Sequence, residues 1–407
     1  MSAEHYNGLM DLVIGKTIGL LMVAILVAIA ARRLRLPYTV GLVVAGMSLA
    51  ISHVDLGITL THDIIFDMIL PPLLFEAALK LRWSELQRDA APILLLSIVG
   101  VLISAAVTYL GMSRLLGWPA APALIFAVLI AATDPVAVIA LFKDLGIQGR
   151  TRLLVESESL FNDGVAAVLF ALALTWISGA PSGAGLPWHL LFTMSGGGLL
   201  VGAVVGLGAL AVAGRTGDHL VETAVTVAAS YGAFLLAEDL HFSGVLATVA
   251  AGLVVGAVGV RAAGRRLGLS RQGRVFVLEF WEFLAFAANS VVFLLIGVSV
   301  SRIQLGGFGY TSLIVTILLV LLGRAACVYP LSLVFRSSRW KITLAEQHVL
   351  FWAGLRGALG LALALSLPDA LPMRGAVVVA TFVVVTFSVV VQGLTMPALL
   401  RRLKLPS

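Results

Sequence analysis

The residues best suited to chemistry lie in two short stretches of an otherwise apolar sequence. Residues 131–142, AATDPVAVIALF, place Thr133 and Asp134 directly before a proline, and residues 156–170, ESESLFNDGVAAVLF, hold three carboxylates and the carboxamide of Asn162. Carboxylate, hydroxyl and backbone carbonyl oxygens are the hard ligands that small cations prefer. A carboxylate can also hold a proton. The two stretches therefore predict a site for a small cation, a proton, or both.

The second stretch gathers its polar groups on one side of a helix. Glu158 and Asn162 are four residues apart, as are Ser159 and Asp163, so in a helix all four lie within an arc of about 140°. Apolar side chains occupy the opposite side, and we expect the polar groups to face the protein interior. Glu156 is nearer the end of the apolar segment, where a solvated carboxylate is the simpler interpretation.

Pro135 predicts a break in the first stretch. Proline has no amide hydrogen and disfavours helical backbone at the preceding residue, here Asp134. We expect carbonyl groups near Thr133 to be freed, and backbone inside a membrane tolerates this only within protein or beside a cavity. An ordinary proline kink is the alternative, but it leaves the adjacent Asp134 unexplained.

The composition places this chemistry in a membrane. The chain has 407 residues, of which 60% are hydrophobic and 12% charged, and its mean hydropathy is +1.06. Soluble domains are about 25% charged. Continuous apolar runs of about 20 residues span a bilayer as helices, because backbone groups must pair within the segment. The runs do not alternate, so the prediction is an all-α polytopic membrane protein and not a barrel.

Thirteen apolar segments are candidate transmembrane helices. They cover residues 9–31, 37–52, 61–79, 90–113, 120–143, 152–178, 188–213, 219–237, 242–260, 275–300, 309–335, 343–367 and 375–400. The first ten residues contain no Lys or Arg, so we interpret the first segment as a helix and not as a secretory signal. No stretch between the segments is long enough for a soluble domain. We therefore expect a single transmembrane domain over residues 1–407, without a soluble regulatory domain.

The basic residues orient these segments. Loops after odd-numbered segments, together with the C-terminal end, hold 21 of the 27 Lys and Arg residues, whereas loops after even-numbered segments hold 3. Cytoplasmic loops carry the excess of Lys and Arg. The predicted topology has the N-terminus outside and the C-terminus in the cytoplasm. A specific anionic-lipid site in the basic loop 261–274 is the alternative use of these charges.

Two arginines lie within the predicted segments. Arg324 is deep in its segment, and Arg356 is flanked by glycines that let the helix loosen. A charge at the centre of a bilayer costs at least about 2.5–3.5 kcal/mol, so each arginine is expected to have an acidic partner. Glu158 and Glu76 are the available partners, and the sequence leaves open which arginine pairs with which.

Other features indicate structure. The single cysteine, Cys327, excludes a disulfide framework, and the seven histidines show no metal-ligand spacing. Glycines spaced by four at Gly198, Gly202 and Gly206 are typical of close helix packing and not of a phosphate loop.

The combination of motifs resembles the monovalent cation/proton antiporters, and specifically the Asn-Asp branch with the NhaP-type sodium/proton antiporters. The resemblance rests on ATDPVAV and ESLFNDGVA in successive segments, PPLLFEAAL in the third and GLRGALGLALAL in the twelfth. It covers essentially the whole chain. It implies two inverted-topology six-helix repeats, about residues 1–180 and 217–402, linked by the helix 188–213, with discontinuous helices 5 and 12.

The resemblance also implies roles for individual residues. It makes Asp163 the exchanging carboxylate and surrounds a sodium ion with Asp163, Asp134, Ser159, the Thr133 backbone and Glu76. It makes Asn162 the replacement for the second aspartate of the electrogenic branch, pairs Glu158 with Arg324, and leaves Arg356 in a supporting role. Exchange of Na⁺ or Li⁺, with K⁺ open, for H⁺ follows by alternating access, electroneutral and one-for-one. No cofactor is expected. The implied assembly is a homodimer in the plasma membrane.

Two other classes of function are compatible with parts of the sequence. A cation channel would also use a proline-broken segment, but it would lack proton coupling. An intramembrane aspartyl hydrolase would use Asp134 and Asp163, although no second motif of that class is evident.

Overall fold

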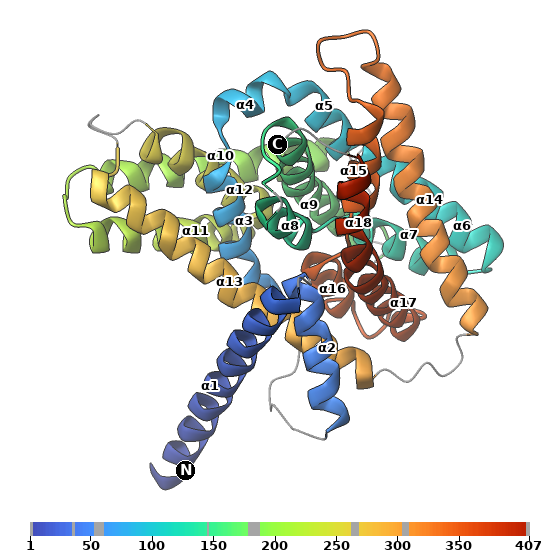
Figure 1. Cartoon of the computed structure of the whole chain (residues 1–407), viewed down its shortest axis with the longest axis horizontal. Coiled ribbons are helices and arrows are strands. Elements are labelled where there is room, and N and C mark those ends of the chain that lie inside the picture. The colour runs from blue at the N-terminus through green and yellow to red at the C-terminus, as the bar shows by residue number, and fades with distance from the viewer. Residues whose placement is uncertain are drawn as a thin grey trace.

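The computed structural model describes residues 3–34, 37–52, 61–144, 146–177, 188–261, 268–302 and 309–403 (Figure 1). Within these ranges all regular structure is helical, as the sequence predicts. Four of the basic residues that orient the chain, Arg35, Arg265, Arg266 and Lys404, lie outside the described residues.

The helices follow the predicted segments closely. The first half of the chain contains α1 (Ala3–Leu34), α2 (Tyr38–Ile51), α3 (Leu70–Lys80), α4 (Trp83–Arg88), α5 (Ala90–Leu94), α6 (Gly100–Leu115), α7 (Ala120–Leu129), α8 (Val136–Asp144) and α9 (Arg150–Ile177). The remainder contains α10 (Trp188–Ala213), α11 (His219–Asp239), α12 (Gly244–Val254), α13 (Arg271–Arg302), α14 (Tyr310–Val334), α15 (Leu344–Ala353), α16 (Ala358–Leu365), α17 (Arg374–Phe387) and α18 (Gly393–Leu403). In the described ranges, eight helical stretches are long and apolar enough to cross a membrane, and four shorter apolar helices accompany them. The exact number of spans stays a prediction.

Four π-helical turns and one short helix were not predicted from the sequence. The turns are η1 (Ile64–Ile69), η2 (Leu95–Val99), η3 (Val255–Val260) and η4 (Ser388–Gln392). They lie inside continuous apolar runs, where hydrophobicity does not distinguish an α-helix from a wider π-turn. The short helix α4 lies between two predicted segments.

Both predicted helix breaks are present. α7 ends at Leu129 and α8 begins at Val136, and α15 ends at Ala353 while α16 begins at Ala358. The first break follows from Pro135, and the second lies in a glycine-flanked segment. Fold prediction and structure therefore agree that segments 5 and 12 are discontinuous, and these two breaks position the candidate site.

Glycines allow several helices to approach at backbone distance. A side chain at Gly198 or Gly202 of α10 would overlap Ser243 or Ala247, and one at Gly206 would contact Ala251 tightly. The prediction that this glycine series mediates helix packing is confirmed, since α10 lies directly against α12. Gly46 of α2 lies similarly close to Leu294 of α13, and Gly297 of α13 lies close to Val43 of α2.

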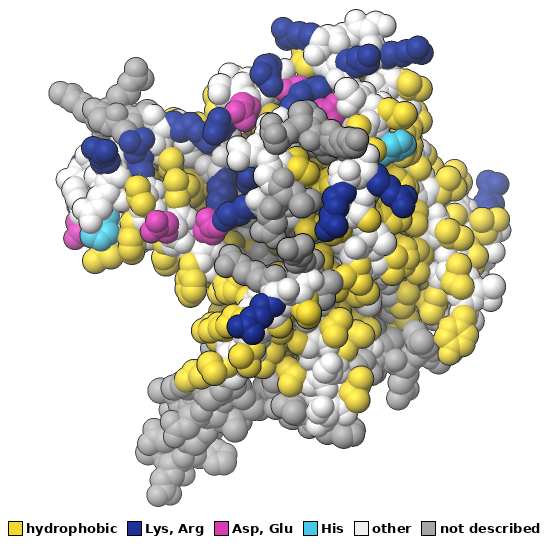
Figure 2. All heavy atoms as spheres, in the orientation of Figure 1, with side chains coloured by type: hydrophobic (Ala, Val, Ile, Leu, Met, Phe, Trp, Pro, Cys, Tyr) yellow, Lys and Arg dark blue, Asp and Glu magenta, His cyan; other side chains and the backbone are white. Residues whose placement is uncertain are grey.

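The molecular surface separates basic from apolar regions. Figure 2 shows most Lys and Arg side chains over its upper part, while hydrophobic side chains dominate the described surface below. Large apolar side chains are widely exposed, including Phe192 at 72% and Leu200 at 67%. Exposed apolar area of this extent suits contact with lipid.

Candidate functional site

The two broken segments cross, and Asp134 lies at the crossing. Its backbone amide donates to the Leu355 carbonyl at 2.7 Å, and its Oδ1 accepts from the Val136 amide at 3.0 Å. The carboxylate also faces the amide of Ala358 and packs directly on Gly357. Asp134 therefore lies at the N-termini of both α8 and α16, where helix dipoles favour a negative charge.

Arg356 binds the opposite end of the first break. Its Nη1 donates to the carbonyls of Ala131 at 2.7 Å and Ala132 at 3.0 Å. Its side chain makes no ion pair with any described residue, so the sequence prediction of an acidic partner for Arg356 is wrong. The physical reason is the break itself, because backbone carbonyls that leave a helix need donors, and a buried guanidinium supplies them.

Arg324 and Glu158 form the expected buried pair. Two guanidinium nitrogens donate to the two carboxylate oxygens at 2.7 Å each, and the residues are 5% and 2% exposed. Arg324 also donates to the Leu350 carbonyl of α15 at 2.8 Å. That carbonyl lies four residues before Gly354, where the helix has ended. Each of the two arginines therefore holds the carbonyl end of one broken helix.

Asn162 ties the first break to α9 with every polar atom of its side chain. Its amide nitrogen donates to Thr133 Oγ1 at 2.6 Å and to Glu158 Oε1 at 3.0 Å. Its oxygen accepts from the Thr133 amide at 3.2 Å. Both the nitrogen and the oxygen of the carboxamide are therefore engaged in protein contacts.

Ser159 of α9 and Thr133 of the first break also contact each other. Ser159 Oγ donates to the Thr133 carbonyl, and Thr133 Oγ1 donates to Ser159 Oγ at 3.2 Å. These oxygens lie beside the wall of a large cavity that both residues line. A cation could reach them from there.

Asp163 lines the same cavity, whose volume is about 1490 Å³. Asp134, Ser159 and Thr133 contribute to the same wall. In the described part of the chain, no hydrogen bond or ion pair engages the Asp163 carboxylate, in contrast to the other carboxylate of α9 that is buried nearby, Glu158. Asp163 is therefore open to a proton or a cation that arrives through the cavity.

Glu76 lines the cavity but does not join the cluster around Asp134. It forms an ion pair with Lys80, four residues later in α3. No hydrogen bond or ion pair among the described residues connects Glu76 to Asp134, Asp163 or an arginine. The prediction that Glu76 is a partner for an arginine is therefore wrong. Glu76 and Lys80 are four residues apart, and this spacing alone could have identified their ion pair.

The cavity carries further charges that sequence reasoning missed. Lys143 of α8 donates to Glu282 of α13 at 2.9 Å, and Lys80 approaches the same carboxylate at 3.6 Å. Arg152 pairs with Glu156, four residues along α9, at 3.4 Å. Lys143 and Glu282 are far apart in sequence, so no spacing rule could have joined them.

Comparison with known proteins places the chain in a family. Residues 20–402 match the family model described as "Sodium/hydrogen exchanger, transmembrane". The chain is 40% identical over 373 residues to the Na⁺/H⁺ antiporter ApNhaP of Aphanothece halophytica, covering 91% of this chain and 70% of that one. It is 34% identical over 399 residues to the Na⁺/H⁺ antiporter NhaH of Halobacillus dabanensis, covering 94% and 96%.

The fold is also found among solved structures. The sodium proton antiporter MjNhaP1 of Methanocaldococcus jannaschii, at pH 8, superposes with a TM-score of 0.78 and 21% sequence identity, over 97% of this chain and 99% of that one. At this identity the likeness establishes the fold alone. The family match extends over nearly the whole chain, including both broken helices and the cavity. The chain therefore belongs to the sodium/hydrogen exchanger family, whose function is the exchange of sodium for protons, and it is a transporter rather than an enzyme.

Proposed function

We propose that the chain exchanges one monovalent cation for one proton, with the Asp163 carboxylate carrying each in turn. The observation that supports this most strongly is the open carboxylate of Asp163 on the wall of the large cavity. The oxygens of Ser159, Thr133 and Asp134 complete the cation site in this proposal, and Glu76 lies along the access route. Na⁺ or Li⁺ is the preferred cation, and K⁺ is to be tested beside them.

The charges of the site support electroneutral exchange. The site contains three carboxylates, Asp134, Glu158 and Asp163, and two guanidinium groups, Arg324 and Arg356. With all of them ionised, the cluster carries one net negative charge, which one proton or one monovalent cation neutralises equally well. Because a net charge buried away from water is costly, the two neutral, loaded states are the ones suited to cross the membrane.

Asn162 supports the same stoichiometry. A carboxylate at this position would raise the negative charge of the cluster by one, whereas the carboxamide adds none. Its contacts to Thr133 and Glu158 give it a structural role between the first break and α9. We therefore assign Asn162, Glu158, Arg324 and Arg356 to support of the site and Asp163 to the exchange itself.

Alternating access follows from the competition of the two ligands. A proton on Asp163 removes the negative charge that a cation needs, and a bound cation disfavours protonation. Lys143 and Arg152 line the large cavity beside the site. They lie at the ends of α8 and α9 that meet the loop predicted to be cytoplasmic. In this proposal the described conformation opens to the cytoplasm, and movement of the broken helices exposes the loaded site to the other side.

The test is exchange in proteoliposomes that contain the purified chain. A sodium gradient should drive proton movement with Na⁺ and Li⁺, and the rate should not change when the membrane potential is clamped at different values. Net charge movement with a potential-dependent rate would overturn the one-for-one stoichiometry. Sodium flux that moves no protons would indicate a channel instead.

We further propose the finer assignments that the sequence suggests. These are a homodimer in the plasma membrane, an external N-terminus and a cytoplasmic C-terminus, and two inverted repeats over about residues 1–180 and 217–402. Mass measurement in detergent tests the dimer. Labelling of single cysteines in the loops from each side of the membrane tests the topology.

A further inference from the structure

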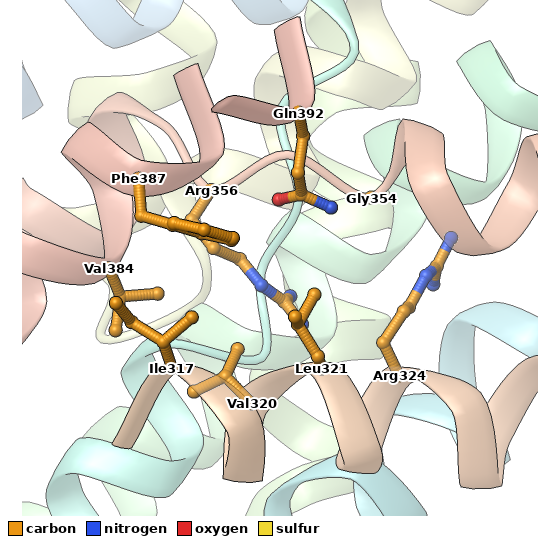
Figure 3. A pocket seen from close by; sticks show the side chains of 9 residues that line it. All are labelled: Ile317, Val320, Leu321, Arg324, Gly354, Arg356, Val384, Phe387 and Gln392. Carbon is orange, nitrogen blue, oxygen red and sulfur yellow. The ribbon is translucent and has the colours of Figure 1, made fainter. Parts of the chain in front are cut away.

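A second and much smaller cavity lies behind Arg356. Figure 3 shows it between α14, α17 and the broken segment that joins α15 to α16. Arg324, Gly354, Arg356 and Gln392 line it together with apolar side chains. Its volume of about 10 Å³ is close to the space that one water molecule needs. Arg356 and Gln392 do not line the large cavity, so this is a separate site.

The guanidinium of Arg356 has unused donors here. Nη1 serves the carbonyls of Ala131 and Ala132, whereas Nε and Nη2 donate to none of the described residues. The residue is only 3% exposed. Buried donors of a charged group that lack a partner are costly, and the cavity is the space in which a partner could lie.

Gln392 presents an acceptor to the same space. Its carboxamide points from η4 into the cavity, with the nitrogen on the side of Gly354 and the oxygen on the side of Arg356 (Figure 3). The nitrogen donates to the Trp352 carbonyl at 3.4 Å. Oε1 accepts no hydrogen bond from the described part of the chain, and Gln392 is 2% exposed. Unused buried donors and an unused buried acceptor therefore face one water-sized cavity.

The π-helical turn η4 directs both of its polar side chains at the broken segment. Ser388 Oγ accepts from the Arg356 amide at 2.9 Å, and Gln392 lies one turn further on. In an apolar helix, two buried polar residues with this spacing need a specific use. Their common target is the backbone and side chain of residues 352–356.

We propose that one water molecule occupies this cavity, accepts a hydrogen bond from the Arg356 guanidinium and donates one to Gln392 Oε1. A water both accepts and donates, as the two facing groups require. An anion such as chloride would accept from Arg356 but would repel the Gln392 oxygen. It would also add a negative charge to a cluster whose carboxylates already outnumber its guanidinium groups. Gln392 is then a positioning residue, which acts on the ion site through this water and Arg356, beside its own hydrogen bond to the Trp352 carbonyl.

An experimental structure of the wild-type chain, at a resolution that shows ordered waters, tests the proposal directly. We expect one spherical peak at hydrogen-bond distance, about 2.7–3.2 Å, from both the Arg356 guanidinium and Gln392 Oε1. An empty cavity in a map with other buried waters would overturn the proposal. Anomalous signal at this position after replacement of chloride by bromide would overturn it as well, by identifying an anion.

Gln392→Met tests the positioning role, because it removes the acceptor, together with the 3.4 Å hydrogen bond to Trp352, and keeps the length of the side chain. Thr381→Val is the matched control, since Thr381 is equally buried on α17 and its hydroxyl donates to Val377 of the same helix. We expect Gln392→Met to raise the apparent KM for sodium several-fold with a smaller change in maximal rate. Thr381→Val should leave both within about twofold of wild type. An unchanged KM in Gln392→Met, or equal effects of the two variants, would contradict the positioning role.

Discussion

Asp134 and Arg356 each donate hydrogen bonds to the broken segment that contains the other residue. The Asp134 amide donates to Leu355, beside Arg356, while the Arg356 guanidinium donates to Ala131 and Ala132, beside Asp134. The acid lies at two helix N-termini and the base at a helix carbonyl end, so each charge opposes the dipole end it meets. The two breaks therefore form one electrostatic unit, and a substitution on one side should affect both.

The two aspartates should respond differently to neutralisation. Asp163→Asn is expected to abolish exchange with little change in the melting temperature, because no described residue contacts its carboxylate through a hydrogen bond. Asp134→Asn should abolish exchange and also lower stability by about 1–3 kcal/mol, because the amide nitrogen that replaces one carboxylate oxygen opposes one of the two backbone donors, at Val136 or Ala358. Exchange in proteoliposomes and thermal unfolding in detergent measure the two effects.

Glu156→Gln is the matched control for these variants. It changes a carboxylate of α9 on the same cavity, but one that is paired with Arg152. We expect it to keep most of the exchange activity. Wild-type exchange by purified Asp163→Asn would remove Asp163 from the central role.

Removal of Arg324 should destabilise the protein strongly. Arg324→Ala leaves the Glu158 carboxylate and the Leu350 carbonyl buried without their donor, and breaking a buried pair from one side costs about 3–5 kcal/mol. Arg82→Ala is the control, because Arg82 pairs with Glu85 at the surface with a side chain 69% exposed. The apparent melting temperature in detergent should fall clearly for Arg324→Ala and hardly for Arg82→Ala. An equal, small effect of both would show that the buried pair contributes little.

The breaks were predictable from sequence because their causes are local. Pro135 places a break in the fifth segment, because it removes one helical hydrogen bond and disfavours helix at Asp134. Helical spacing placed Glu158, Asn162, Ser159 and Asp163 on one side of α9. The same local rules failed for Arg356, whose partners are backbone carbonyls. A carbonyl has no signature in the sequence, so an acidic side chain was expected in its place.

Contacts between segments that are far apart in the chain could not be predicted from the sequence. The pair of Lys143 and Glu282 depends on how α8 lies against α13, which neither hydrophobicity nor spacing encodes. The docking of Ser388 and Gln392 on the second break likewise depends on the π-helical turn η4, which an apolar run does not reveal.

Asn162→Asp should not yield a working two-charge transporter. The carboxylate would lose both donors, to Thr133 and to Glu158, and would place a negative charge directly against Glu158. We expect loss of exchange and a lower melting temperature, with the loss of stability larger at pH 8 than at pH 5. The sign follows because a protonated Asp can restore one donor at low pH, whereas the ionised form restores none.

Asn162→Leu separates charge from hydrogen bonding in this position. It removes the same donors without adding a charge. Leucine does not titrate, so residue 162 should add no pH dependence to the stability of this variant. Faster, potential-dependent exchange by Asn162→Asp at an unchanged melting temperature would contradict the structural role of the carboxamide.

Gly357→Ala should disable the site through steric overlap alone. Gly357 has φ −135° and ψ −151°, an extended conformation that any residue adopts, so alanine introduces no backbone strain. Its Cβ would instead overlap the Asp134 side chain. Oδ1 of that side chain accepts from the Val136 amide, and the Asp134 backbone is fixed by its own bond to the Leu355 carbonyl, so the side chain has little room to withdraw. The crossing of the two segments must then open, and we expect exchange to fall at least about tenfold, the effect of losing about 1.4 kcal/mol of transition-state stabilisation.

Gly208→Ala is the control for this contact, because a Cβ at Gly208 meets nothing within 4 Å. In the interior of α10, alanine should keep exchange and leave stability equal or higher by about 0.5–1 kcal/mol. The measurement is the exchange rate per folded molecule in proteoliposomes. Activity of Gly357→Ala equal to that of Gly208→Ala would show that the two breaks can separate without harm to exchange, and the electrostatic unit of Asp134 and Arg356 would then not be needed for transport.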